Sequence, residues 1–173
     1  TATCTQTVTV VDNINPTITC PANITVNVGA GTCTATVLAA ALGTPTTADN
    51  CSVASVSNNH PSTTYSLGAN SVIWTVTDGS GNTATCTQTV TVVDNINPTI
   101  TCPANITVNV GAGTCTATVL AAALGTPTTA DNCSVASVTN NHPSTTYTLG
   151  ANSVVWTVTD GSGNTATCTQ TVT

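Results

Sequence analysis

Short runs of alternating apolar and polar residues, separated by turn residues, make up most of the chain. In the clearest run, Ser71–Thr77, Val72, Trp74 and Val76 lie on one face, the pattern of a strand that buries one side. The strands expected in one stretch of the chain are Thr17–Cys20, Ile24–Val28, Cys33–Leu38, Ser52–Ser57, a short strand around Tyr65, Ser71–Thr77 and Thr83–Val93. Trp74 and its counterpart Trp156 are the expected core anchors, because large aromatic side chains usually pack inside.

The residues between these runs are typical of turns. Gly29–Gly31 and Asp78–Asn82 read as tight turns, and Ala39–Asn50 reads as a loop in which Ala39–Leu42 could form a helical turn. Seven or so short strands joined by such turns indicate an all-β, immunoglobulin-like sandwich.

The chain repeats itself with a period of 82 residues. Thr1–Thr91 matches Thr83–Thr173 at all but three of the 91 overlapping positions. The differences are Ser57/Thr139, Ser66/Thr148 and Ile73/Val155. A period of this length fits a small sandwich domain rather than a solenoid rung. We therefore expect tandem repeats at residues 12–93 and 94–173, with residues 1–11 as the last strand of a preceding, truncated repeat.

The composition excludes several classes of function. The chain has no Lys or Arg and a net charge of -6, so it lacks the basic surface that binding to nucleic acid or to anionic lipid requires. It has no apolar run of about 18 residues, so no membrane-spanning segment is expected. With 40% hydrophobic residues it should fold rather than stay disordered.

The nine cysteines follow the repeat, and four fall in each complete unit. No C-x2-C pair is present, so disulfides in an oxidising compartment are favoured over zinc. The strand order favours Cys20–Cys86, because both residues would lie at the same end of the sandwich. That leaves Cys33–Cys51, although simple threading puts these two at opposite ends, and a Cys4–Cys20 link fits less well. The expected set is Cys20–Cys86, Cys33–Cys51, Cys102–Cys168 and Cys115–Cys133, with Cys4 paired outside the fragment.

Several motifs together resemble the hyalin repeat (HYR) family. They are D-N-I-N-P-T-I-T-C-P-A-N-I-T-V, then G-T-C-T-A-T-V, A-D-N-C-S, and W-T-V-T-D-G-S-G-N-T-A-T-C-T-Q-T-V-T-V. The resemblance implies an immunoglobulin-like fold, an extracellular location, and a role in cell adhesion or as a structural stalk, without enzyme activity. Near-identical copies without basic residues are more similar to a giant bacterial surface protein than to an animal one.

The aspartates are the candidate metal ligands. On the sandwich threading, Asp12, Asp49 and Asp78 reach one end of the unit, and no basic residue is present to balance them. Ca²⁺ takes oxygen ligands of this kind, and it would stiffen the hinge between repeats. The alternative is that Asp-Asn and Asp-Gly are simply turn formers. The candidate ligands are Asp12, Asn13, Asn15, Asp49, Asp78 and Asn82 in the first repeat, and Asp94, Asn95, Asn97, Asp131, Asp160 and Asn164 in the second. No other cofactor is expected.

The expected function is that of a stalk or spacer in an extracellular adhesin. Its partners would be neighbouring repeats and a surface receptor or glycan. No enzyme is expected, because His60 lies in a turn without a positioned partner and no nucleophile-elbow pattern is present. One alternative is a filament subunit in which Thr1–Val11 completes a neighbouring domain by strand addition. A more remote alternative, ice binding, rests on the regular Thr positions of the Thr83–Val93 strand.

Overall fold

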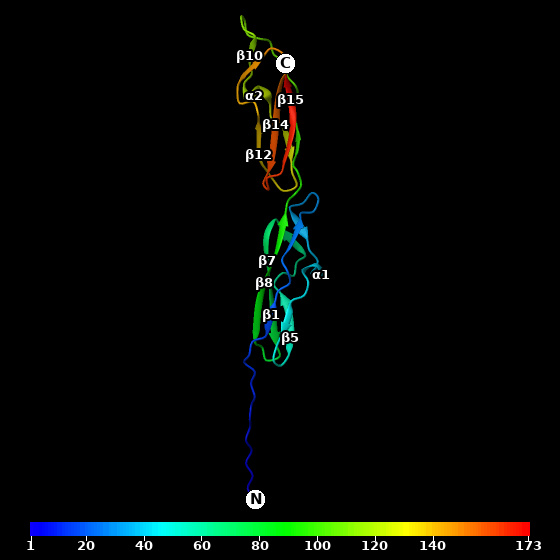
Figure 1. The fold of residues 1–173 in the computed structure, drawn as a ribbon, viewed down its shortest axis with the longest axis vertical. Coiled ribbons are helices and arrows are strands. Elements are labelled where there is room, and N and C mark those ends of the chain that lie inside the picture. The colour runs from blue at the N-terminus through cyan, green and yellow to red at the C-terminus, as the bar shows by residue number, and fades with distance from the viewer. The chain divides into compact units, whose positions relative to one another are not determined.

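The computed structural model describes all residues from Thr1 to Thr173 and divides into two compact units (Figure 1). The first unit contains Thr1–Val26 and Thr34–Val92, and the second contains Asn27–Cys33 and Val93–Thr173. The segment Asn27–Cys33 of the first sequence repeat therefore belongs with the second unit.

The first unit is built from eight strands and one helical turn, in three sheets. The largest sheet has the order β2-β8-β7-β5, and β1 pairs with β4 and β3 with β6 in two smaller sheets. β7 and β8 are antiparallel and run in continuous register from Gly68↔Val92 to Thr77↔Thr83. The elements are β1 Thr17–Thr19, β2 Ile24–Asn27, β3 Thr34–Thr36, α1 Ala39–Leu42, β4 Thr46–Ala48, β5 Val53–Asn58, β6 Thr64–Ser66, β7 Gly68–Asp78 and β8 Thr83–Val93.

The second unit repeats this plan. Its main sheet has the order β12-β14-β15, and the position of β2 is represented by an isolated parallel bridge between Ile106 and Val172. Its elements are β9 Thr99–Thr101, β10 Thr116–Thr118, α2 Ala121–Leu124, β11 Thr128–Ala130, β12 Val135–Asn140, β13 Thr146–Thr148, β14 Asn152–Asp160 and β15 Thr165–Val172. Neither four-residue helix is long enough to cross a membrane.

Alternation along β7 and β8 produces the core of the first unit. Val72, Trp74 and Val76 of β7 are buried, as the sequence pattern predicts, and Val90 and Val92 of β8 are buried as well. In the second unit Trp156 is buried in the equivalent place, and the half-buried Cys102 and Cys168 pack against the same cluster. The fold is all-β, as expected.

A buried glutamine joins three parts of each core. Gln88 is fully buried, and its Oε1 accepts a hydrogen bond from Trp74 Nε1 at 3.0 Å. Its Nε2 donates to the carbonyl oxygens of Ala22, at 2.8 Å, and Leu42, at 2.9 Å. Gln170 makes the equivalent bonds in the second unit. A buried polar side chain whose bonds are all made fixes its neighbours in one arrangement.

Two segments differ from the expected pattern. The predicted loop Ala39–Asn50 contains, besides the helical turn α1, the strand β4, whose residues pair with β1 from Thr17↔Ala48 to Thr19↔Thr46. Thr1–Val11, the expected last strand of a preceding repeat, has no secondary structure and is exposed throughout.

The disulfides agree with the expected set only in part. Cys20 is joined to Cys86, and Cys102 to Cys168, each pair with its Cα atoms 5.7 Å apart. The expected Cys33–Cys51 and Cys115–Cys133 bonds are wrong, because Cys33 is instead joined to Cys133. Cys4, Cys51 and Cys115 carry free, exposed thiols.

The length of β7 explains why Cys33 and Cys51 do not pair. Cys33 precedes β3, which pairs with β6 beside the start of β7 at Gly68. Cys51 lies beside the other end of β7, where Gly79 N donates to Ser52 O at 3.1 Å. A strand of 11 residues is roughly 33 Å long between its ends, whereas a disulfide requires Cα atoms within about 7 Å.

We predict that Gln88→Leu destabilises the first unit selectively. The substitution leaves the Trp74 N–H and the Leu42 carbonyl buried without partners, at a cost of about 1–3 kcal/mol for each group. It also removes the bond to the Ala22 carbonyl. Because Gln170 still stabilises the second unit, urea unfolding should separate into two transitions. Thr87→Val, at an exposed position of the same strand, should change stability by less than about 0.5 kcal/mol. An unchanged unfolding curve for Gln88→Leu would contradict this role.

We predict a loss of stability at alkaline pH that originates in the two tyrosines. Burial raises the pKa of Tyr65 and of Tyr147, above the ordinary value of about 10. The unfolded chain then releases these protons at lower pH than the folded chain, so stability is fully present below about pH 10 and falls as the pH rises further. Tyrosinate absorbance should rise together with unfolding. Titration of both phenols near pH 10 in a chain that stays folded would contradict the prediction.

Candidate metal centre

The inward alternation of β7 continues to its last residue, so Asp78 is buried at the end of the strand. The carboxylate organises the loop that follows. Its Oδ1 accepts hydrogen bonds from the backbone N–H of Ser80, at 2.9 Å, and of Asn82, at 2.8 Å. Its Oδ2 accepts a third bond from Asn82 Nδ2 at 2.7 Å. Asp160 and Asn164 repeat this arrangement in the second unit.

Two further aspartates meet Asp78. Asp12 comes from the segment before β1 and Asp49 from the loop after β4, and one carboxylate oxygen of each of the three residues lies within 4.8 Å of the others. We call this group the first triad. The second triad is the equivalent group of Asp94, Asp131 and Asp160, with the same separation. The two triads contain all six acidic residues of the chain.

Several oxygens of the triads are buried without any hydrogen-bond donor. In the first triad these are Asp12 Oδ2 and Asp49 Oδ1. In the second triad they are Asp94 Oδ2 and Asp131 Oδ1. Asn132 Oδ1, beside this triad, is also buried without a donor. Asp94 as a whole is only 4% exposed. A buried carboxylate oxygen without a donor is costly unless a positive charge compensates it, and the chain has no Lys or Arg to supply one.

Turn formation explains only part of this geometry. Asp12 Oδ1 accepts the N–H of Ile14 at 3.1 Å, and Asp49 Oδ2 accepts the N–H of Cys51 at 2.9 Å. These bonds are typical of aspartates that shape turns. Each uses one oxygen and leaves the other free of donors within the triad. The arrangement therefore serves turn formation and also provides an oxygen cluster of the kind that hard cations such as Ca²⁺ take as ligands.

The triads influence the ionisation of nearby groups. Burial alone would raise the pKa of Asp78, but hydrogen bonds from the Asn82 side chain and from backbone amides of the same loop outweigh it and lower the pKa. The pKa of Asp160 is lowered against the effect of burial in the same way. The pKa of Cys51 is raised, mainly by the hydrogen bond and the negative charge of Asp12. The hydrogen bonds of the loop thus favour the ionised form of Asp78, whereas Asp12 disfavours a thiolate at Cys51.

The candidate ligands from sequence fall into two groups. Asn82 lies at the first triad, where its Nδ2 also donates to Asp12 O at 3.3 Å, and Asn164 does the same at the second. Asn13, Asn15, Asn95 and Asn97 are exposed and make no hydrogen bond to a carboxylate of either triad. Asn132 is absent from the candidate ligands predicted from sequence. It donates to Asp94 Oδ1 at 3.3 Å, and its position directly after Asp131 was the available signal.

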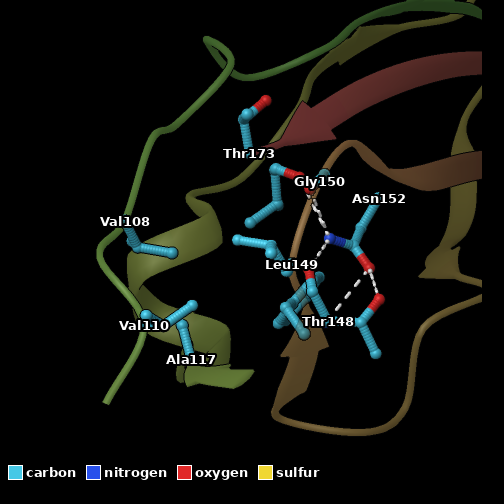
Figure 2. A pocket seen from close by; sticks show the side chains of 10 residues that line it. Val108, Val110, Ala117, Thr148, Leu149, Gly150, Asn152 and Thr173 are labelled. Atoms are coloured by element: carbon cyan, nitrogen blue, oxygen red, sulfur yellow. Dashed lines mark hydrogen bonds between the residues drawn. The ribbon is translucent and has the colours of Figure 1, made fainter. Parts of the chain in front are cut away.

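The histidine of the first repeat lies between a tyrosine ring and a backbone carbonyl. His60 stacks on Tyr65 with ring centroids 4.0 Å apart, and its Nδ1 lies 2.7 Å from Ser62 O. The pocket in Figure 2 has a volume of about 20 Å³, room for about one water molecule. Asn152 at its edge is already paired, since its Nδ2 donates to the carbonyls of Thr148 and Gly150 (Figure 2).

The chain is similar to a known domain family and to a known protein. The HYR domain family matches residues 11–92 and again residues 93–173. Hyalin from Strongylocentrotus purpuratus is 34% identical over 169 residues, which cover 94% of this chain. The chain spans only 14% of the length of that relative.

Proposed function

Because the chain belongs to the HYR domain family, we propose that it is part of an extracellular, adhesion-type repeat protein and serves there as a stalk or spacer. The observation that carries this proposal is the pair of near-identical units, each with its own core and its own disulfide. Repeating one stable unit adds length without adding a new site.

The sites of difference between the repeats support a spacer. Ser57/Thr139 and Ser66/Thr148 are exposed swaps between hydroxyl side chains, and Ile73/Val155 removes one methylene group at a partly exposed position. Each unit therefore presents nearly the same surface. That repetition suits a structural role better than recognition of one specific receptor, and we propose neighbouring repeats as the main partners. An unidentified surface receptor or glycan stays a prediction, as does a bacterial source.

We further propose that each triad holds one hard divalent cation, with Ca²⁺ as the best fit. The three carboxylates, the buried oxygens without donors and the lack of any basic side chain support this assignment. In the second unit the cation would join three segments of the chain, because Asp94 precedes β9, Asp131 follows β11 and Asp160 ends β14. The segment Asp94–Pro98 before β9 would thereby be fixed to its own unit.

A filament assembled by strand addition is less well supported. Val10 is 93% exposed, whereas its counterpart Val92 in β8 is 1% exposed, so Thr1–Val11 carries a strand's apolar face without a partner. A second copy of this chain offers no empty place for it, because β15 already occupies the position beside β14. We therefore favour a tandem array over strand exchange. We do not favour ice binding, since the outward Thr columns of β7 and β8 cover only two neighbouring strands.

We predict that Ca²⁺ raises the unfolding temperature and that Asp94→Asn reduces this gain in the second unit. Binding to the folded state alone stabilises it by about 2.7 kcal/mol at a free concentration of 100 times the dissociation constant. In chelator, Asp94→Asn should not destabilise the unit, because it keeps Oδ1 as an acceptor and removes a charge from the second triad. Scanning calorimetry in Ca²⁺ and in chelator measures both effects.

Asn95→Ala is the matched control for Asp94→Asn. Asn95 is the next residue and is exposed, and it has no hydrogen bond to the second triad, so its replacement should leave the response to Ca²⁺ unchanged. The cation proposal fails if the unaltered chain melts at the same temperature in Ca²⁺ and in chelator, or if Asp94→Asn gains as much from Ca²⁺ as the unaltered chain does.

We predict that the chain with its free thiols alkylated is a monomer in sedimentation experiments at all concentrations. If Thr1–Val11 instead drives strand addition, self-association should appear and Val10→Asp should abolish it, because the equivalent Val92 is buried. Thr9→Asp alters the opposite face of the same segment and serves as the control. Self-association that is lost in Val10→Asp and kept in Thr9→Asp would replace the stalk with the filament.

A further inference from the structure

The disulfide between Cys33 and Cys133 connects one sequence repeat with the next. Cys33 is the second cysteine of the first repeat and Cys133 is the third cysteine of the second, 100 residues further along the chain. Their Cα atoms are 4.8 Å apart. The loop that carries Cys33 belongs with the second compact unit, so the bond forms where the chain already gathers these residues.

Asn132 supports this bond on both sides. Its Nδ2 donates to Thr32 O, next to Cys33, at 3.0 Å and contacts Cys133 Sγ at 3.3 Å. The backbone N–H of Cys133 is held by Asp131 Oδ2 at 2.9 Å. Cys133 is therefore positioned by the same loop that contributes Asp131 to the second triad.

The contacts that position Cys133 are also present around the free Cys51. Asn50 Nδ2 lies 3.3 Å from Cys51 Sγ, and Asp49 Oδ2 accepts the N–H of Cys51 at 2.9 Å. These contacts equal those of Asn132 and Asp131 with Cys133. Cys51 is exposed and unpaired. Its surroundings are therefore those of Cys133, but no cysteine equivalent to Cys33 is bonded to it.

The loop that carries Cys33 likewise has a counterpart around the free Cys115. The loops Gly29–Cys33 and Gly111–Cys115 have the same sequence, and Gly31 and Gly113 have positive φ values of 70° and 76°. Thr114 N donates to Gly111 O at 3.0 Å, as Thr32 N donates to Gly29 O at 3.1 Å. Cys115 is exposed and unpaired, so it ends a loop shaped like the one that carries Cys33.

We propose that in an array of these repeats the second cysteine of every repeat is bonded to the third cysteine of the following repeat. Cys51 is the partner of the second cysteine of a preceding repeat, and Cys115 is the partner of the third cysteine of a following repeat. Each junction is then bridged twice, once by the peptide chain and once by a disulfide.

The bond forms by ordinary thiol–disulfide exchange with a small disulfide such as oxidised glutathione. The Cys115 thiolate attacks one glutathione sulfur, forming a mixed disulfide and releasing one glutathione thiolate. The thiolate of the third cysteine in the following repeat attacks the Cys115 sulfur and releases the second glutathione. The two cysteines together lose two electrons and two protons, and oxidised glutathione is reduced to two thiols.

This second connection protects the array against cleavage between repeats. The Cys20–Cys86 and Cys102–Cys168 bonds close loops within their own repeats, so only the peptide chain between Cys86 and Cys102 would otherwise join them. With Cys33 bonded to Cys133, a cut in that stretch leaves the two repeats attached.

A single trypsin site tests this connection. The chain has no Lys or Arg, so in Asn95→Lys trypsin can cut only after residue 95, an exposed position between the two closed loops. The oxidised protein is alkylated, unfolded in urea and digested, which makes cleavage independent of the folded structure. We expect the two halves to stay joined until a reductant is added. Val93→Lys, at an exposed position in the same stretch, provides a second cleavage site.

Two cysteine variants decide the outcome. In Asn95→Lys with Cys33→Ser the halves should separate without reductant, and with Cys51→Ser they should stay joined. If bonds form within repeats instead, the Asn95→Lys protein itself separates without reductant. Halves that stay joined in the Cys33→Ser variant would also overturn the proposal.

A longer chain tests the extension of the pattern. Repeating residues 92–173 after Thr173 supplies the following repeat that Cys115 lacks. Non-reducing peptide mapping should find Cys115 bonded to the third cysteine of the added copy, with Cys51 still free. Cys133→Ser is the matched control, because it should free Cys33 and leave the Cys115 bond intact. Loss of the Cys115 bond in that variant, or a Cys115–Cys133 bond in the unaltered longer chain, would contradict the proposal.

Discussion

Each repeat depends on the cross-link between its first and last cysteines. The core of a unit contains one Trp, one Tyr and a small set of aliphatic side chains, so hydrophobic burial alone provides a modest driving force. The Cys20–Cys86 bond spans 66 residues, and closing a loop of that size stabilises the fold by about 4 kcal/mol through the unfolded state. Gln88 then fixes Trp74 to the chain around Ala22 and Leu42. Covalent and polar connections thus replace the large aromatic core that the composition does not allow.

The absence of basic residues sets the second constraint. Every carboxylate must be balanced by hydrogen bonds or by a cation from solution, and all six are gathered into two triads. Asp78 uses both oxygens to hold its own loop. Asp12 and Asp49 use one oxygen each, and the other oxygen of each is buried without a hydrogen-bond donor. Turn formation and cation binding are therefore compatible uses of the same residues, and the cation would act on the segments that lead into each unit.

The sequence predicts much of this structure, and its failures have physical causes. The strands β7 and β8 and the buried Trp74 follow from strict alternation, and the three aspartates follow from where the loops end. The strand β4 was missed because Thr46–Ala48 is only three residues long and lies between turn residues. Asn13 and Asn15 lie close to Asp12 in the sequence but are exposed and make no hydrogen bond to its carboxylate, which spacing alone does not reveal. The partner of Cys33 was missed because Cys51 and Cys133 have identical sequence surroundings, so the pattern cannot tell which copy provides the bond.

The chain cross-links its repeats to one another as well as within themselves. Counting reactive thiols in the oxidised chain, by alkylation in denaturant followed by mass measurement, is the sharpest test of this arrangement. We expect three modified cysteines, namely Cys4, Cys51 and Cys115. If Cys33 bonded to Cys51 and Cys115 to Cys133, only Cys4 would be modified. A single alkylated cysteine would therefore rule out the bond between Cys33 and Cys133.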